Sequence, residues 1–188
     1  MRVIGGEFRS RVLKSVPGLE TRPTPDRLRE ALFNVLAPRI GGAVFADLYA
    51  GTGAVGIEAL SRGAARAIFV EHNRAAVNVI HENLRSLGLE PRAQVREGRS
   101  LQALKKIEAE VVFLDPPYER EKEYALALEV LGSRLPALVV VQHDRRLKLE
   151  ESYGSLKREK VMKQGDNVLS FYEADGSGDA RTLHPPEE

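Results

Sequence analysis

The sequence predicts an α/β fold in which a mostly parallel sheet is covered by helices on both faces. Short, almost continuously apolar runs alternate with segments of helical periodicity, as expected for strands buried on both sides of a parallel sheet. The 188 residues are 43% hydrophobic and 29% charged, which suits one domain with a sizeable core and a small extension. The last two apolar runs meet at a short polar turn and predict a closing antiparallel hairpin.

The pattern divides the chain into three parts. Residues 1–40 are expected to form an N-terminal extension, 41–174 the main domain and 175–188 a disordered tail. Core strands are expected at residues 44–49, 66–70, 92–96, 110–114 and 137–142. Helices are expected at 54–62, 73–87, 100–107 and 121–132, and the hairpin strands at 154–163 and 167–173.

The N-terminal extension is expected to contain a β-hairpin followed by a helix. Gly5-Gly6 is a turn candidate for the hairpin. Thr24 can cap the helix with Pro25 as its first residue, and Pro38 and Gly41-Gly42 are expected to end it. The apolar face of this helix would consist of Leu28, Ala31, Leu32, Val35 and Leu36.

Basic residues dominate the first 30 positions, with seven Lys or Arg against four Asp or Glu. Cations spread along a segment and interleaved with an aromatic residue suit contact with a phosphate backbone. A solvated basic face is an equally simple interpretation of the charge alone. The arginines concerned are Arg2, Arg9, Arg11, Arg22, Arg27 and Arg29, the last two on the expected polar face of the helix.

A glycine-rich turn follows the first predicted core strand. Gly51, Gly53 and Gly56 would let a ligand approach the backbone at a helix N-terminus, although this spacing alone is a weak signal. Glu71 lies at the end of the second strand, where an acid can hold two ribose hydroxyls. A dinucleotide and S-adenosylmethionine both fit this pattern. Asp47 favours S-adenosylmethionine, because a carboxylate attracts its cationic amino-acid moiety but fits poorly beside a pyrophosphate.

Asp115-Pro116-Pro117-Tyr118 follows the fourth apolar run, at the strand end where open α/β sheets bind ligands. A base amino group is a poor nucleophile because its lone pair is delocalised into the ring. Two acceptors for its protons, the Asp115 carboxylate and the Pro116 carbonyl, would favour the pyramidal form of the transition state. Pro117 would add rigidity, and Tyr118 could stack on an extruded base. The alternative interpretation is an ordinary proline-rich turn.

Several classes of chemistry are excluded or disfavoured by composition. The chain has no cysteine, which excludes disulfides, thiolate metal sites and methylation of a ring carbon through a cysteine adduct. The four histidines lack metal-ligand spacing, so no metal is expected. No apolar run is long enough for a membrane span and no signal peptide is recognisable, so we expect a cytoplasmic protein. We also expect the protein to be a monomer.

The set formed by Asp47, Gly51-Thr52-Gly53, Glu71 and Asp115-Pro116-Pro117-Tyr118 resembles the class I S-adenosylmethionine-dependent amino-methyltransferases. The resemblance extends from residue 2 to about residue 173. The front of the chain specifies the family more closely. There the chain closely resembles the bacterial enzymes that methylate guanine N2 in small-subunit (16S) ribosomal RNA. The residues that carry this closer resemblance are Arg2-Val3-Ile4-Gly5-Gly6, Arg22-Pro23-Thr24, Asp26-Arg27-Leu28-Arg29-Glu30 and Leu32-Phe33-Asn34.

This resemblance implies a Rossmann-like class I fold with a seven-stranded sheet whose last strand is antiparallel. It also implies that the extension helps to hold the methyl donor and a ribosomal RNA within a ribosomal particle. The donor-binding residues would be Asp47, Tyr49, Gly51, Thr52, Gly53, Glu71, Arg99 and Asp115, and Thr24 would join the arginines at the RNA. The chain departs from the family pattern at Glu97-Gly98-Arg99-Ser100, where many relatives have Asp or Asn for the donor's adenine.

Other functions remain open on sequence alone. Adenine-N6 methylation of DNA or RNA uses chemistry too similar for the tetrapeptide to separate. Glutamine-N5 methylation of protein is disfavoured, because those enzymes usually have Asn where this chain has Asp115. A nicotinamide-dependent oxidoreductase would leave Asp47 and the tetrapeptide without a role. A non-catalytic RNA-binding assembly factor would not need Asp115.

Overall fold

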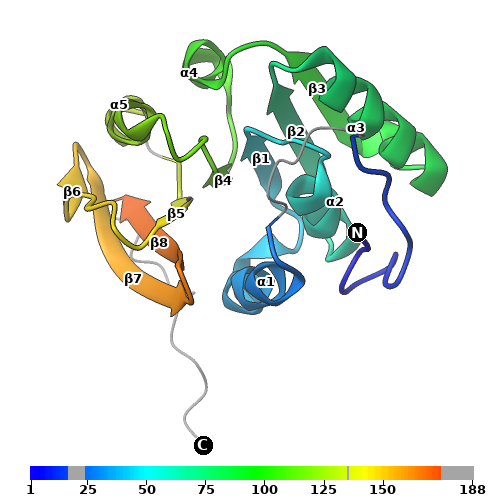
Figure 1. Ribbon diagram of the computed structural model, residues 1–188, viewed down its shortest axis with the longest axis horizontal. Helices are drawn as coiled ribbons and strands as arrows, with labels where there is room; N and C mark the ends of the chain where they lie inside the picture. The colour runs from blue at the N-terminus through cyan, green and yellow to red at the C-terminus, as the bar shows by residue number, and fades with distance from the viewer. Residues whose placement is uncertain (17–23, 135, 175–188) are drawn as a thin grey trace, which may run out of the picture.

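The computed structural model describes residues 1–16, 24–134 and 136–174, and its centre is one sheet of eight strands (Figure 1). The sheet order is β3-β2-β1-β4-β5-β8-β7-β6. The strands are β1 (Val44–Leu48), β2 (Arg66–Glu71), β3 (Ala93–Glu97), β4 (Val111–Leu114), β5 (Leu138–Asp144), β6 (Ser152–Tyr153), β7 (Leu156–Gln164) and β8 (Asn167–Ala174). The helices are α1 (Asp26–Ile40), α2 (Ala54–Ser61), α3 (Arg74–Leu87), α4 (Ser100–Ala103) and α5 (Glu121–Gly132), with short 3-10 turns at Glu90–Arg92 and Leu104–Lys106.

The predicted α/β fold is confirmed, with each strand and helix of the main domain close to its expected place. The helix expected at 100–107 is split into α4 and a 3-10 turn. The sequence predicts seven strands and the sheet has eight, because the two residues of β6 pair with the edge of β7. The expected tail, 175–188, lies outside the described residues, and the boundary at residue 40 stays a prediction.

Strand order places two loops side by side at one edge of the sheet. Strands β1 to β5 are parallel, whereas β8 is antiparallel to β5 and β7. The chain winds from β1 outward to β2 and β3, then crosses to β4 on the other side of β1. Ligands bind at such a switch point in open α/β sheets. Leu48 is in register with Leu114, so the glycine-rich turn and the Asp-Pro-Pro-Tyr tetrapeptide begin at the same level.

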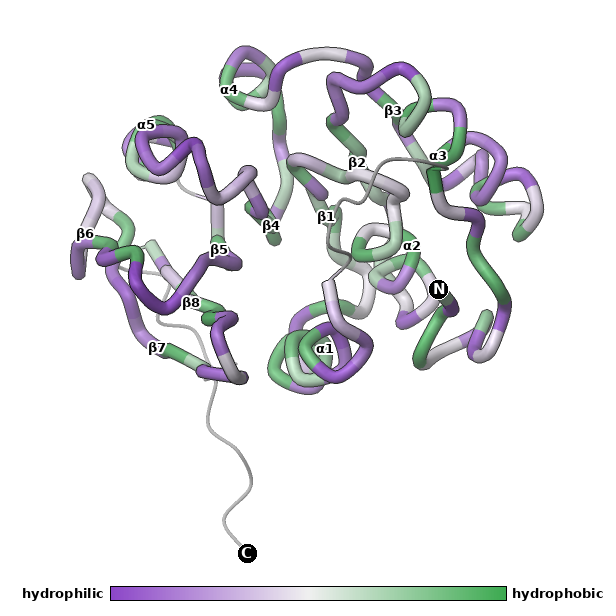
Figure 2. The backbone as a smooth tube through the Cα atoms, viewed as in Figure 1, coloured by the Kyte–Doolittle hydropathy of each residue, from purple (hydrophilic) through white to green (hydrophobic). Residues whose placement is uncertain are grey.

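Two apolar layers cover the sheet, with α1, α2 and α3 on one face and α4 and α5 on the other (Figures 1 and 2). Phe45, Phe69 and Phe113 are fully or almost fully buried in the first layer. Tyr124 and Leu128 of α5 lie in the second. Val3 and Leu13 of the N-terminal segment belong to the first layer, so this segment packs against the same core as α2. No helix among the described residues is long and apolar enough to cross a membrane.

The predicted N-terminal hairpin is present in a short, irregular form. Arg2 and Val12 form an antiparallel bridge, and the N–H groups of Val3, Ser10 and Leu13 donate to carbonyls of the opposite arm. The backbone between the arms also bonds to α2, because the N–H groups of Ile4 and Gly5 each donate to Glu58 at 2.8 Å. A methyl group on Gly6 would come within 1.9 Å of the Ser61 carbonyl oxygen, so the loop lies directly against the end of α2.

Helix α1 differs from its prediction at its start and at Pro38, whereas the predicted end at Gly41-Gly42 is confirmed, with Gly41 as the C-cap. It begins at Asp26 with Pro25 as N-cap and no side-chain cap, so the capping role predicted for Thr24 is wrong. It continues through Pro38 to Ile40, because a proline close to the C-terminal end removes one hydrogen bond without ending the helix. Arg29, predicted on the polar face, is 0% exposed.

Candidate active site

The loop after β1 is a tight turn with residues in the left-handed region. Tyr49 has a φ of 67° and Gly53, the N-cap of α2, a φ of 80°, both in the left-handed region. A φ of this sign is uncommon for a residue with a side chain and often marks a functional turn. The side chain of Asn83 on α3 donates to the Thr52 carbonyl at 3.1 Å and fixes the middle of the loop.

The third glycine of the motif serves helix packing. A Cβ on Gly56 would lie 2.3 Å from the ring of Phe69 on β2, a distance that side-chain contacts essentially never reach. Gly56 therefore lets α2 approach the sheet closely. Its N–H donates to Oδ2 of Asp47 at 2.9 Å, so Asp47 also fixes the first turn of α2.

Glu71 closes the glycine loop from the end of β2. It is 6% exposed, and its two carboxylate oxygens accept from the N–H groups of Gly51 and Asn73, each at 2.8 Å. The side chain is thus aimed at the loop, as the sequence predicted for its position. Its contact with a ribose stays a prediction.

Asp47 and Asp115 form a pair of acids at the switch point. Burial raises the pKa of Asp47 to about 7, opposed by the Gly56 N–H and assisted by the charge of Glu71. Burial also raises the pKa of Asp115 to about 8, with Asp47 as the second cause. A cation between them would favour both charged forms. The pair therefore suits a positively charged ligand.

The tetrapeptide is held in place from two other elements. The buried phenol of Tyr124 on α5 donates to the Pro116 carbonyl at 2.8 Å. The phenol of Tyr118 donates to Oδ1 of Asn167, the first residue of β8, at 2.9 Å. The ring of Tyr118 is partly exposed and Pro117 is exposed, so this end of the loop faces solvent. Sequence reasoning found the tetrapeptide but neither of its two anchors.

A cavity of about 210 Å³ lies beside this pair of loops. It is smaller than most ligand pockets, which occupy roughly 300–1,000 Å³. Two predicted donor-binding residues, Tyr49 and Arg99, contribute to it, whereas Asp115 does not. Its lining residues are Tyr49, His72, Arg99, Ser100, Leu101, Gln102, Arg120 and Glu123.

The predicted RNA-binding arginines divide into an exposed group and one buried residue. Arg2, Arg9 and Arg27 are exposed and line a second cavity of about 310 Å³ together with Asp26 and Glu30. Arg11 is exposed on the opposite arm of the N-terminal segment. Thr24 is partly buried, and Arg22 falls outside the described residues.

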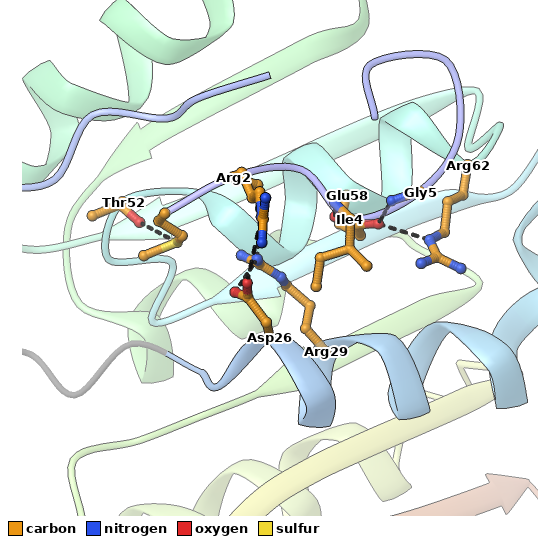
Figure 3. Close-up of polar contacts among 9 residues, drawn as sticks. Arg2, Ile4, Gly5, Asp26, Arg29, Thr52, Glu58 and Arg62 are labelled. Atoms are coloured by element: carbon orange, nitrogen blue, oxygen red, sulfur yellow. Dashed lines mark hydrogen bonds and ion pairs between the residues drawn. The ribbon is translucent and has the colours of Figure 1, made fainter. Parts of the chain in front are cut away.

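Arg29 is a structural residue, which corrects its predicted place on the RNA-binding surface. Its Nη2 donates to the Arg2 carbonyl at 2.7 Å and to Asp26 at 3.0 Å, as Figure 3 shows. Its Nε and Nη1 have no hydrogen-bond partner within the described part of the chain. Burial lowers the pKa of the guanidinium, and the charges of Glu58 and Asp26 oppose this effect.

Glu58 is a buried acid whose negative charge acts on the guanidiniums of Arg29 and Arg62, and sequence reasoning missed it. Its side chain is 0% exposed and accepts from Nε of Arg62 at 2.8 Å, besides the N–H groups of Ile4 and Gly5 (Figure 3). A buried charge needs such partners to be stable. The available signal was a single acid in an otherwise apolar helix, Ala54–Ser61.

The pKa values of the acid pair predict a pH-dependent rate. If Asp115 acts as an ionised carboxylate towards the predicted methyl donor and amine, kcat/KM for the donor should rise with pH through about 8 and level off roughly one pH unit higher, because the free protein must first lose the proton of Asp115. In Asp47→Asn the rise should occur at lower pH, since the Asp47 charge no longer raises the pKa of Asp115. Initial rates at low donor concentration test this, and an unshifted profile in Asp47→Asn would count against coupling of the two acids.

Comparison with known proteins shows the family of the chain. The model of the family "Conserved hypothetical protein 95" matches residues 1–173. A protein of Bacillus subtilis provisionally named rRNA methyltransferase YlbH is 38% identical over 94% of this chain and 100% of its own length. Ribosomal RNA small subunit methyltransferase D of Escherichia coli is 40% identical over 96% of this chain and 94% of its own. A solved structure from Escherichia coli, provisionally described as the methyltransferase yhhF, superposes with a TM-score of 0.81 at 34% identity, covering 93% of this chain and 97% of its own.

Residues 1–173, matched by the family model, include the N-terminal extension, the glycine loop and the tetrapeptide. The predicted relationship to ribosomal RNA methyltransferases is confirmed at the level of the family. The chain belongs to the conserved hypothetical protein 95 family, with rRNA methyltransferases among its relatives.

Proposed function

We propose that the protein transfers a methyl group from S-adenosylmethionine to the exocyclic N2 of a guanine in small-subunit ribosomal RNA. The observation that carries the proposal is the alignment of β1 with β4, which starts the glycine loop and the Asp115 tetrapeptide at neighbouring points of one sheet edge. The names of the relatives in Bacillus subtilis and Escherichia coli support ribosomal RNA as the substrate. The finer target, guanine 966, rests on the family resemblance alone.

The residues at the switch point fit the cationic donor. S-adenosylmethionine supplies an electrophilic methyl group on a positively charged sulfur. Two acids with raised pKa values, Asp47 and Asp115, favour a cation at this edge. Glu71 would hold the ribose, and the loop from Gly51 to Gly53 would face the amino-acid part. Arg99, at the cavity beside Tyr49, is the proposed neighbour of the adenine.

Asp115 and Pro116 would activate the target amine. A carboxylate and a carbonyl that accept hydrogen bonds from the two N–H groups of the amine favour a pyramidal nitrogen. They also stabilise the positive charge that develops on this nitrogen as its bond to the methyl group forms. Tyr118, with its partly exposed ring at the mouth of the loop, would stack on the extruded base. Positioning then supplies much of the acceleration, and no covalent intermediate is required.

The exposed arginines of the extension would hold the RNA. Arg2, Arg9 and Arg27 line one cavity at the start of α1, and Arg11 is exposed on the other arm of the N-terminal segment. Several guanidiniums around a concave surface suit bidentate contacts with phosphates. Thr24 and Arg22 are proposed RNA contacts as well, Arg22 from the sequence alone. We expect a monomer to act on a ribosomal particle in the cytoplasm.

Arg27→Ala should weaken RNA binding about threefold to tenfold and reduce the slope of log K against log salt by about 1, because one phosphate contact is lost. Filter binding at several salt concentrations measures both quantities. Arg66→Ala is the control, since Arg66 is exposed at the amino end of β2, away from the site. An unchanged salt slope in Arg27→Ala would show that this basic face is only solvated.

The proposed function is tested with donor carrying a labelled methyl group. Separated ribosomal RNAs and small subunits from cells lacking this protein are incubated with it, and the nucleosides are then analysed. Labelled N2-methylguanosine from the small-subunit RNA is the expected product. Labelled N6-methyladenosine or methylglutamine would overturn the guanine assignment. Binding of NADH but not of the donor, or RNA binding without any transfer, would overturn methyl transfer itself.

A further inference from the structure

The first turn of α5 contacts both loops of the candidate active site. The phenol of Tyr124 donates to the Pro116 carbonyl at 2.8 Å. The preceding residue, Glu123, accepts from the phenol of Tyr49 at 2.7 Å and from Arg120 at 2.9 Å. Glu123 and Tyr124, consecutive residues of α5, therefore connect the start of the glycine loop, at Tyr49, to the Asp-Pro-Pro-Tyr tetrapeptide.

The Pro116 carbonyl has one rotation that needs to be fixed. The proline ring holds its φ, and the following proline restricts it to extended conformations. The freedom that remains is a narrow range of ψ, about +120° to +160°, over which the carbonyl oxygen still changes direction. A carbonyl accepts through two lone pairs, so the bond from Tyr124 occupies one and leaves the other for a second donor. The bond thereby fixes the direction of that second acceptor site.

Tyr124 is well placed to impose this direction because its own ring cannot move easily. The residue is 0% exposed and lies in the apolar layer between α5 and the sheet, with Leu114 and Leu128 in the same cluster. The backbone of the tetrapeptide is tied to the start of α5 as well, because the Arg120 N–H donates to the Pro117 carbonyl at 2.9 Å. The loop and the helix thus form one rigid unit.

We infer that Tyr124 is a positioning residue for methyl transfer, which aims the Pro116 carbonyl at a proton of the target amine. The inference rests on the proposed function and deepens it, since the residue acts through the carbonyl and need not touch the substrate. It assigns catalytic importance to a buried tyrosine on α5 that sequence analysis had no reason to select. The substrate class that requires this device is a planar exocyclic amine, which must be held by two acceptors at once.

The test is Tyr124→Phe, which keeps the buried ring and removes only the hydrogen bond. Tyr172→Phe is the matched control, because Tyr172 is also 0% exposed and its phenol donates to a backbone carbonyl, that of Glu150, at 2.8 Å. Single-turnover methyl transfer to small-subunit RNA should slow about 10-fold to 100-fold in Tyr124→Phe, as expected for a misplaced reacting group. The dissociation constants for donor and RNA should stay within about twofold, because neither ligand contacts the phenol.

The control separates positioning from stability. Both variants lose the bond of a phenol to a backbone carbonyl, and Tyr172→Phe also loses the hydrogen bond between Tyr172 and Arg158. The midpoint of thermal unfolding should therefore fall at least as much in Tyr172→Phe, whereas only Tyr124→Phe should lose rate. Equal transfer rates in the two variants, with the wild type active, would overturn the inference and leave the proposed function intact. A wild type that transfers no methyl group to any ribosomal RNA would overturn the proposed function and this inference together.

Discussion

Asp115→Asn should lower the single-turnover rate of methyl transfer by about 1,000-fold, while the donor still binds within about tenfold of its wild-type affinity. The substitution keeps the shape of the side chain and one acceptor oxygen but removes its negative charge. A positive charge that develops on the attacking nitrogen would then have no carboxylate beside it. Burial, the first cause of the raised pKa of Asp115, makes this loss large, because charges interact more strongly away from water.

The control for Asp115→Asn is Asp166→Asn in the turn between β7 and β8. Asp166 has a half-exposed side chain, paired with Arg145 at 3.0 Å, so its replacement should leave the rate unchanged. Isothermal titration with the donor and rapid-quench measurement of the rate check the two expectations separately. Equal loss of donor binding and rate in Asp115→Asn would make Asp115 a donor-binding or structural residue and contradict its role as an acceptor.

The main features of the fold could be predicted because each strand and helix has a strong local pattern. Four continuously apolar residues, Val111–Leu114, become β4, buried along its whole length. Asn73 caps α3 by accepting from the N–H groups of Ala75 and Ala76, and Gly88 ends it in the left-handed conformation. Such signals are read from neighbouring residues and need no knowledge of distant contacts.

The N-terminal segment could not be predicted equally well, because distant partners decide its structure. The sequence around Gly5 predicts the paired arms but not where they pack: the Glu58 carboxylate, 53 residues away, accepts from the N–H group of Gly5. Arg29 follows the same rule. Its helical phase did not indicate burial, and its position depends on the Arg2 carbonyl and on the charge of Glu58.

The candidate site shows the same division between local and distant information. Motif spacing correctly placed Glu71 and Asp115 at the carboxyl ends of β2 and β4, and their roles stay predictions. The anchors Glu123 and Tyr124 lie in an amphipathic helix, where an acid and an aromatic residue are ordinary. Only the packing of α5 against β4 shows that their polar atoms meet the two loops. The positions of Glu123 and Tyr124 beside the two loops could therefore be found only from the three-dimensional structure.

Glu58→Ala should lower the free energy of unfolding by about 3–5 kcal/mol, the cost typical of removing one partner of a buried ion pair. The carboxylate is 0% exposed and accepts three hydrogen bonds at 2.8 Å, from Ile4, Gly5 and Arg62. Its loss leaves two backbone N–H groups without their acceptor. It also leaves the buried guanidinium of Arg29 without the largest charge that favours it. Urea denaturation measures the change.

Glu90→Ala is the control, since Glu90 forms an exposed ion pair with Arg85 at 3.5 Å and should contribute about 0–1 kcal/mol. Amide hydrogen exchange should also become faster at Ile4 and Gly5 in Glu58→Ala, while the β4 amides change only through global stability. Because Arg2 and Arg9 are carried by this segment, RNA affinity should fall more than donor affinity. Similar unfolding free energies for the two variants would contradict the view that Glu58 fastens the N-terminal segment to α2, and the RNA-binding surface would then need another support.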